Sequence, residues 1–368
     1  MKKIWMLLLL CAGCCVAVPA AGGTASDPLV SLSYLKNSFT ADFLRQAEEK
    51  LDETEKTVSA YLEQELAPLS PTGTVGDCQR ALSFTECALN RGDTLTMDTG
   101  GNLIPLAGGI SAAIEGVCVD VTLGKELSGT VTLTANHRYM VAEDSAVQFS
   151  ATGKTAVTQI CGDYTLTRST QTDWRALADA LNRLTLFRGT NRGYGNGYDL
   201  EEPLTREQAL VMLIRLLGEE DEALASTADI PFTDALNHWS RSYIAYAYEK
   251  GYTNGMNATS FGIGVQASAN MYVEFVLRAL GYSSTATTDI NDAPERACSD
   301  GVLTSAEVEL LRSEAFLRAD AVYLSYYALS TQICDSSQTL AQRLIADGVF
   351  TRSDYRSAQK LVTVERIQ

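Results

Sequence analysis

Histidine is scarce in this sequence, which contains two histidines among 368 residues. Among the cysteines after residue 25 no Cys-x-x-Cys pair is present either, so the usual ligand sets for zinc are missing, and we expect neither a metal nor another cofactor. Basic residues are outnumbered: 29 Lys and Arg stand against 45 Asp and Glu, a formal net charge of −16. Because a protein that binds nucleic acid presents a basic face, no nucleic-acid partner is expected. We interpret the acidic surplus as a solvated surface.

Patterns of catalytic sites are missing as well. The sequence contains no Gly-x-Ser-x-Gly elbow, no Cys/His set and no paired carboxylates at a defined spacing. Asp120, Glu143 and Asp144 could be combined into an acid/base set, but no spacing rule supports this, so we interpret them as surface turn residues. We therefore expect no enzymatic activity.

One marked apolar run lies at residues 4–10, after two lysines and before a tail of small residues. This order indicates a secretory signal peptide over residues 1–25. The motif CAGC, which ends at Cys14, offers an alternative: a lipoprotein signal, although its first cysteine stands where leucine is usual. No later stretch approaches the ~18 apolar residues of a membrane span. We expect an exported protein that touches the membrane only if Cys14 is lipidated.

The cysteines after the signal are even in number, which permits three disulfides in an exported chain. Sequence order suggests bonding each cysteine to the next, but six cysteines allow 15 connectivities, and buried free thiols are the alternative. The possible disulfide residues are Cys78, Cys87, Cys118, Cys161, Cys298 and Cys334.

Two kinds of periodicity divide the rest of the chain. Residues 26–70 show helical spacing of apolar residues with a charged opposite face. From Asp93 to Thr165 the chain contains short segments of period two separated by glycine turns, which is typical of a small all-β sandwich or barrel. We expect this β-rich module to span residues 75–166. Helical spacing returns after residue 172. The sequence therefore predicts a multidomain α+β chain.

A capped helix follows a glycine-rich turn in the next part of the chain. Thr205 stands at the N-cap position, and Gln208 is its capping-box partner. The helix that follows Thr205 has one apolar face, which must be buried. A single helix–loop–helix cannot bury this face alone. Similar stretches occur twice more, and their alignment places Ala269 and Arg318 at the position of Arg206. The predicted units are residues 172–218, 228–282 and 289–333, with a helical extension over 334–368.

The motifs FTD, HW, YI, NG and TRE in these copies resemble the S-layer homology family, which occurs in triplets on surface proteins of Gram-positive bacteria. The resemblance implies a C-terminal three-repeat bundle whose grooves bind an anionic secondary cell-wall polysaccharide. The second and third copies are degenerate: Ser268, Ala269 and Asn270 replace the second TRE motif, and the third copy has no tryptophan.

The resemblance also implies which residues bind the polymer. Arginine forms a planar fork that matches carboxylates, and an aromatic ring can cover a sugar. Arg206 is expected to face solvent in the first turn of its helix, with a salt bridge between repeats as its alternative role. The alternative for Trp239 is a core position. The residues to which the binding role transfers are Thr205, Arg206, Glu207, Trp239 and Arg318.

These observations lead to three hypotheses for the function. The first is a non-catalytic protein of the cell surface, or of the outer membrane face if it is a lipoprotein, which attaches to the wall polysaccharide and displays the β module. The second is an exported enzyme that acts on cell-wall glycan. The third is a surface scaffold whose degenerate repeats bind protein rather than glycan.

Overall fold

The computed structural model describes residues 50, 54, 57, 78–190, 193–283 and 290–368. The chain divides into two compact units, Met1–Pro71 and Thr72–Gln368, and the description below concerns the second. The predicted signal peptide, Cys14 and most of the predicted helical segment 26–70 lie outside the described residues. No helix in the described part of the chain is both long and apolar enough to cross a membrane.

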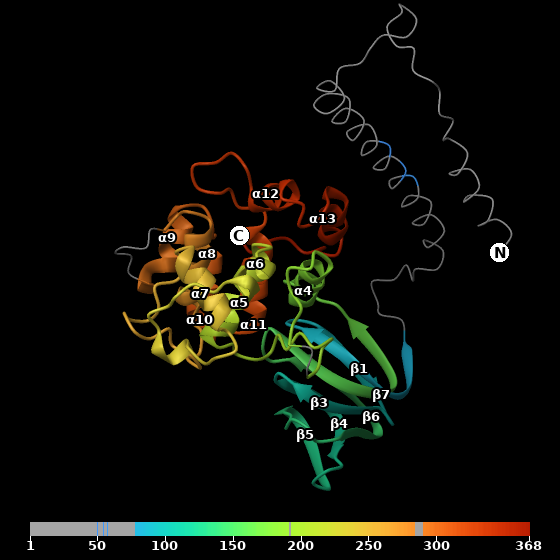
Figure 1. The fold of residues 1–368 in the computed structure, drawn as a ribbon. Coiled ribbons are helices and arrows are strands. Elements are labelled where there is room, and N and C mark those ends of the chain that lie inside the picture. Colours follow the sequence, from blue (N-terminus) through green and yellow to red (C-terminus); the bar gives the residue numbers. More distant parts are fainter. Residues whose placement is uncertain (1–49, 51–53, 55–56, 58–77, 191–192, 284–289) are drawn as a thin grey trace, which may run out of the picture. The chain divides into compact units, whose positions relative to one another are not determined.

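The β module is one antiparallel seven-stranded sheet (Figure 1). Its order is β1-β7-β2-β6-β4-β5, and β3 pairs with both β6 and β7. Pairing within this path gives a continuous sheet with β1 and β5 at its two ends. The strands are β1 (Gln79–Asn90), β2 (Thr94–Asp98), β3 (Asn102–Ala107), β4 (Ile110–Asp120), β5 (Lys125–Thr132), β6 (Tyr139–Ala151) and β7 (Thr155–Thr167).

Strands β2 and β3 together occupy one position in the sheet, between β6 and β7. Met97 of β2 pairs with Tyr164 of β7, and further along the same strand Asn102 of β3 pairs with Cys161. The interruption between them requires a close approach at Gly162. Its φ is 116°, and a Cβ there would lie 3.0 Å from the Gly101 Cα, tighter than ordinary contact. This is a position that only glycine fits well.

The core of the module lies on one face of the sheet, as the period of two predicts. In β2, for example, Leu95 and Met97 are fully buried while Thr94 and Thr96 are partly exposed. Strand β1 has no such alternation: its first eight residues are exposed except Ala81, and Leu82 is 88% exposed. The pairing register of β1 shifts between Ala81 and Thr85. Period two therefore does not indicate this strand, although it lies within the β module predicted over residues 75–166.

Helices follow the β module, which confirms a mixed α+β chain (Figure 1). They are α4 (Trp174–Arg183), α5 (Arg206–Leu216), α6 (Glu220–Ala225), α7 (Arg241–Glu249), α8 (Ala269–Ala279), α9 (Ala293–Ser299), α10 (Ser305–Ser313), α11 (Arg318–Ala328), α12 (Leu340–Ala346) and α13 (Arg352–Gln359), with short 3-10 turns η2 (Thr233–Ala235) and η3 (Ile290–Asp292).

Three of these helices, α5, α8 and α11, each have eleven residues and contact one another in all three pairings. Each also packs against one outer helix: α5 against α7, α8 against α9, and α11 against α4. Their facing residues, such as Leu213, Leu277 and Val322, are fully buried. Because the buried face is shared, each helix depends on the other two for its stability.

Charged side chains join the β module to the helices. The Lys154 ammonium, in the turn before β7, is 3.0 Å from Glu314 and 3.1 Å from Asp320, and it donates to the Ala315 carbonyl at 3.3 Å. Arg91 forms two hydrogen bonds to the Glu314 carboxylate, at 2.7 and 2.9 Å. The Arg91 hydrogen bonds lower the pKa of Glu314 to about 2, whereas burial raises the pKa of Asp320 against the attraction of Lys154.

All six cysteines considered for disulfides are free in the structure, which therefore contains none of the suggested pairs. Cys78 and Cys87 lie nine residues apart along extended chain at β1, which separates their Cα atoms by more than about 20 Å; a disulfide needs less than about 7 Å. Cys118 of β4 and Cys161 of β7 are separated by β6 and β3. Cys298 lies on α9 and Cys334 precedes α12.

Candidate ligand-binding grooves between the helices

Arg206 is the first residue of α5, and it is 3% exposed. Its side chain reaches the loop before α8, where Nε donates to the Phe261 carbonyl at 2.9 Å and an Nη donates to Thr253 Oγ1 at 3.3 Å and the Gly255 carbonyl at 3.4 Å. The guanidinium lies 5.0 Å from the centre of the Phe261 ring and 4.9 Å from that of Phe275. The prediction that Arg206 faces solvent is therefore wrong: the loop of the following helix pair folds over it.

The charge of Arg206 is not neutralised by a carboxylate among the described residues. Its hydrogen-bond acceptors are two carbonyls and a hydroxyl. Burial, together with the nearby positive charge of Arg278, lowers the pKa of Arg206 to about 10. The side chain stays protonated at neutral pH, so the site holds a buried cation for which the described residues supply no counter-ion, which is unusual in proteins.

A cavity of about 340 Å³ opens beside this cation, and Arg206, Met256, Met271 and Arg278 are among the residues that line it. The Arg278 side chain donates to Glu274 at 2.6 Å, and Arg296 donates to the other oxygen of that carboxylate at 2.7 Å. Two arginines thus share the buried Glu274, and Arg206 adds a further positive charge. We call this cavity, defined by Arg206, Met271 and Arg278, the first groove.

The loop that holds Arg206 is itself fixed by Asp234 of η2. The Asp234 carboxylate accepts hydrogen bonds from the backbone N–H groups of Phe261, Gly262 and Ile263, at 2.8–3.1 Å. Burial would raise the pKa of Asp234, but these bonds outweigh it and lower the pKa to about 2. At neutral pH the carboxylate is therefore ionised and orders the loop.

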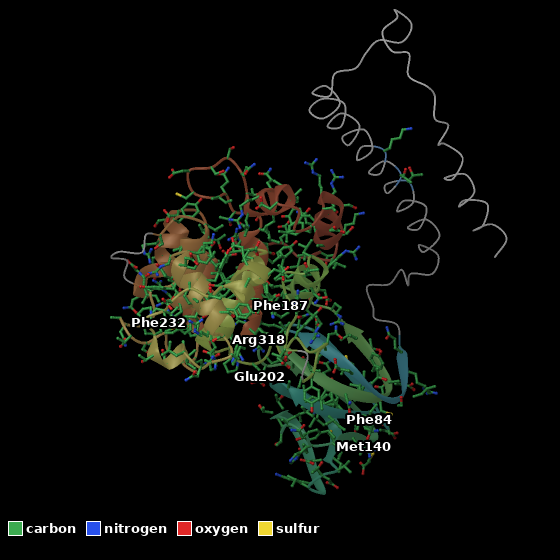
Figure 2. The ribbon with its side chains drawn as sticks, viewed as in Figure 1. Phe84, Met140, Phe187, Glu202, Phe232 and Arg318 are labelled. Atoms are coloured by element: carbon green, nitrogen blue, oxygen red, sulfur yellow. The ribbon has the colours of Figure 1, made fainter. Side chains whose placement is uncertain are left out.

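A second groove, of about 170 Å³, lies along α5, and Thr190, Gln208, Arg215, Trp239 and Arg318 are among the residues that line it. Arg318 is 5% exposed. Like Arg206 it donates to a backbone carbonyl, from one Nη to Asp199 at 2.9 Å, and its backbone N–H donates to the Glu202 carbonyl at 3.0 Å (Figure 2). Unlike Arg206 it has a carboxylate nearby, since Asp199 Oδ2 lies 4.0 Å from the guanidinium.

The two grooves occupy equivalent places on the central helices. The first groove is lined by the third, sixth, seventh and tenth residues of α8: Met271, Glu274, Phe275 and Arg278. The second is lined by the same positions of α5: Gln208, Val211, Met212 and Arg215. In each case the buried arginine comes from the first residue of a neighbouring central helix, Arg206 of α5 or Arg318 of α11.

The structure groups the predicted site residues differently from the sequence. Trp239 does not line the first groove with Arg206; it lies in the second groove with Arg318. It is 59% exposed, so the alternative of a core position for Trp239 is wrong. Glu207 is 5% exposed and accepts from the Gly264 N–H at 3.1 Å, a contact that supports the loop.

Thr205 begins α5 as predicted, and its N–H donates to the Gln208 side chain at 3.1 Å. Its own hydroxyl is buried and has no hydrogen-bond partner in the described part of the chain, so only half of the capping box forms. Neither Thr205 nor Glu207 lines the two grooves. Arg278 and Arg215, the tenth residues of α8 and α5, were not predicted as site residues. Their equivalent positions in the aligned copies were the signal that could have identified them.

Comparison with known proteins places part of this region in a family. Residues 231–264, which include Asp234, Trp239 and the loop around Arg206, match the S-layer homology domain. Over 107 residues the chain is 33% identical to a protein of Thermoanaerobacter kivui described as "Cell surface protein". This match covers 28% of the chain and 14% of the relative. The two findings support a surface protein that contains an S-layer homology domain.

Proposed function

We propose that this chain is a non-catalytic protein that attaches to the bacterial cell wall, with the first groove binding an anionic secondary cell-wall polysaccharide. The observation that favours this function is Arg206, a buried cation that has no carboxylate partner in the described part of the chain, at the edge of a 340 Å³ cavity. An anionic ligand would supply the missing counter-ion. In this proposal the three central helices belong to three repeats, residues 172–218, 228–282 and 289–333, and the β module is displayed from the wall.

The chemistry of the groove suits a carboxylate on a sugar. A guanidinium fork forms charge-assisted hydrogen bonds with carboxylates, each worth about 1.5–3 kcal/mol. Arg278 lines the same cavity and is held in place by Glu274, so a ligand would meet an oriented cation as well as Arg206. The chain as a whole has a net charge of −16, so positive potential at this groove distinguishes it from the surrounding surface.

The first experiment is a pull-down of the protein with purified cell-wall sacculi, before and after extraction of the secondary polymer. Binding that disappears on extraction supports the polysaccharide as ligand. Binding that survives extraction, or is absent from the start, contradicts the proposal and favours the scaffold hypothesis. Zymography on cell-wall substrate tests the non-catalytic part of the proposal, since a cleared band would show enzymatic activity.

We predict that Met271→Glu weakens wall binding at least tenfold, whereas Met271→Gln leaves it nearly unchanged. Met271 lines the first groove and is the third residue of α8, after the capping Ser268. A glutamate at this position completes a capping box and should not destabilise the helix. Its charge would, however, repel the anionic glycan, and such like-charge contacts cost several kcal/mol. The measurement is sacculus binding, with melting temperatures of both variants as a control; equal binding of both contradicts the groove assignment.

Trp239→Ala is predicted to weaken wall binding about tenfold, the effect expected of an aromatic residue at an interface centre. The ring lies beside the second groove and is exposed, so its removal should leave the fold intact. Tyr194→Ala is the matched control, because Tyr194 is also exposed, at 41%, and lines neither groove. If the two variants bind sacculi equally well, the second groove does not contact the polymer.

A further inference from the structure

A third groove should exist between α8 and α11, by analogy with the other two, but it is almost filled. The equivalent sixth, seventh and tenth residues of α11 are Tyr323, Leu324 and Tyr327, and they line a space of about 10 Å³. That is enough for roughly one water molecule. The first and second grooves measure about 340 and 170 Å³.

The central helix that should supply the arginine to this groove, α8, has none at its first position. The first residue of α8 is Ala269, at the position of Arg206 and Arg318. Instead, Arg366 enters the third groove from the segment after α13, and it lines the space together with Glu307. Its guanidinium lies 5.1 Å from the centre of the Tyr327 ring.

Arg366 is held by a set of acceptors that match a guanidinium. Nε and an Nη donate to the two oxygens of Glu307, both at 2.6 Å, and the same Nη donates to the Val302 carbonyl at 2.7 Å. Glu307 is 1% exposed. It also accepts from the Tyr323 hydroxyl at 2.7 Å and from the Thr304 N–H at 2.8 Å. The carboxylate is therefore oriented by groups other than Arg366.

Backbone contacts fasten the residue next to Arg366. The Ile367 N–H donates to the Tyr323 hydroxyl at 3.1 Å, and the Ile367 carbonyl accepts from the Thr304 hydroxyl at 2.9 Å. The segment is thus bound as a short extended peptide with one side chain in a pocket. Planar bidentate recognition of this kind selects arginine over lysine.

We propose that the third groove is a guanidinium-binding pocket that the chain fills with its own Arg366. With Arg366 removed, the pocket would present the Glu307 carboxylate and two tyrosines, a set that suits a cation and repels an anion. The third groove would then not be a glycan site, in contrast to the first two; this last part rests on the proposed function.

The test uses the full chain with Arg366→Ala and a small probe, methylguanidinium. We expect the melting temperature of this variant to fall by several degrees, and millimolar methylguanidinium to recover a substantial part of the loss by binding the vacated pocket. Methylammonium, which has the charge without the fork, should recover much less. Neither probe should stabilise the wild type, whose pocket is filled, or the double variant Arg366→Ala with Glu307→Gln.

Equal effects of the two probes, or no effect of either on Arg366→Ala, would overturn the pocket assignment. If Arg366→Ala does not fold alone, the same test asks whether methylguanidinium restores its folding and methylammonium does not. Sacculus binding of Arg366→Ala should equal that of the wild type; stronger binding would show that the opened groove takes glycan and would overturn its preference for cations. Failure of the wild type to bind sacculi would contradict the proposed function alone, because the probe result does not depend on it.

Discussion

Arg206→Ala is expected to lower the free energy of unfolding by about 2–3 kcal/mol, a large effect for a residue in the first turn of a helix. The substitution removes hydrogen bonds to the half-buried Gly255 carbonyl and to the buried Phe261 carbonyl, and an unsatisfied buried group costs about 1–3 kcal/mol. It also removes the packing against Phe261 and Phe275. Relief of the repulsion from Arg278 offsets only part of this loss.

Arg352→Ala is the matched control for this prediction. Arg352 is also the first residue of a helix, α13, and it also follows a capping threonine. It is exposed, however, and surface substitutions of this kind usually change stability by less than about 0.5 kcal/mol. Chemical denaturation of both variants measures the difference. Equal stabilities would mean that the loop before α8 does not depend on Arg206.

The sequence was sufficient to predict features that depend on neighbouring residues. Period two located strands such as β2, because its inner face is buried and its outer face is not. The Thr205 position located the start of α5, because the capping pattern is local. The same pattern did not indicate strand β1, because most of its side chains are exposed on both faces and burial imposes no alternation.

The site depends on contacts between distant segments, and the sequence indicated these less well. Arg206 looked like a solvated first-turn charge because the groups that bury it, Phe261 and Gly255, lie about fifty residues away and fold over it. Close packing of this loop requires Gly255, where a Cβ would overlap the Phe232 ring. Local spacing cannot show that Trp239 lies in the same groove as Arg318 rather than Arg206, because this depends on how the helices pack around one another.

Lys154 is another case in which the local context was misleading. It follows a glycine in a turn between two strands, where lysine is ordinarily solvated. In the structure its side chain is 2% exposed and lies against two carboxylates of the helical part. A buried ammonium needs such partners, so the β module and the helices complete each other's charge balance at this point.

Lys154→Met is therefore expected to destabilise the chain by about 3–5 kcal/mol, the usual cost of removing one partner from a buried ion pair. Methionine keeps most of the aliphatic volume, so the loss reports mainly on the charge. Asp320 is 3% exposed and would remain without the cation that now lies 3.1 Å away. Glu314 would be affected less, because Arg91 still binds it.

Chemical denaturation of the full chain measures this effect, and Lys125→Met is the control, since Lys125 is exposed in β5 and should change stability little. A second variant separates charge from packing. Asp320→Asn combined with Lys154→Met leaves no buried charge at this position, while the asparagine oxygen can still accept from the Leu317 N–H that Asp320 now caps. The double variant should therefore be more stable than Lys154→Met alone, because removing both partners of a buried pair costs less than removing one. If it is no more stable, Lys154 and Asp320 are not energetically coupled, and the attachment of the β module to the helices rests on Arg91 and Glu314 instead.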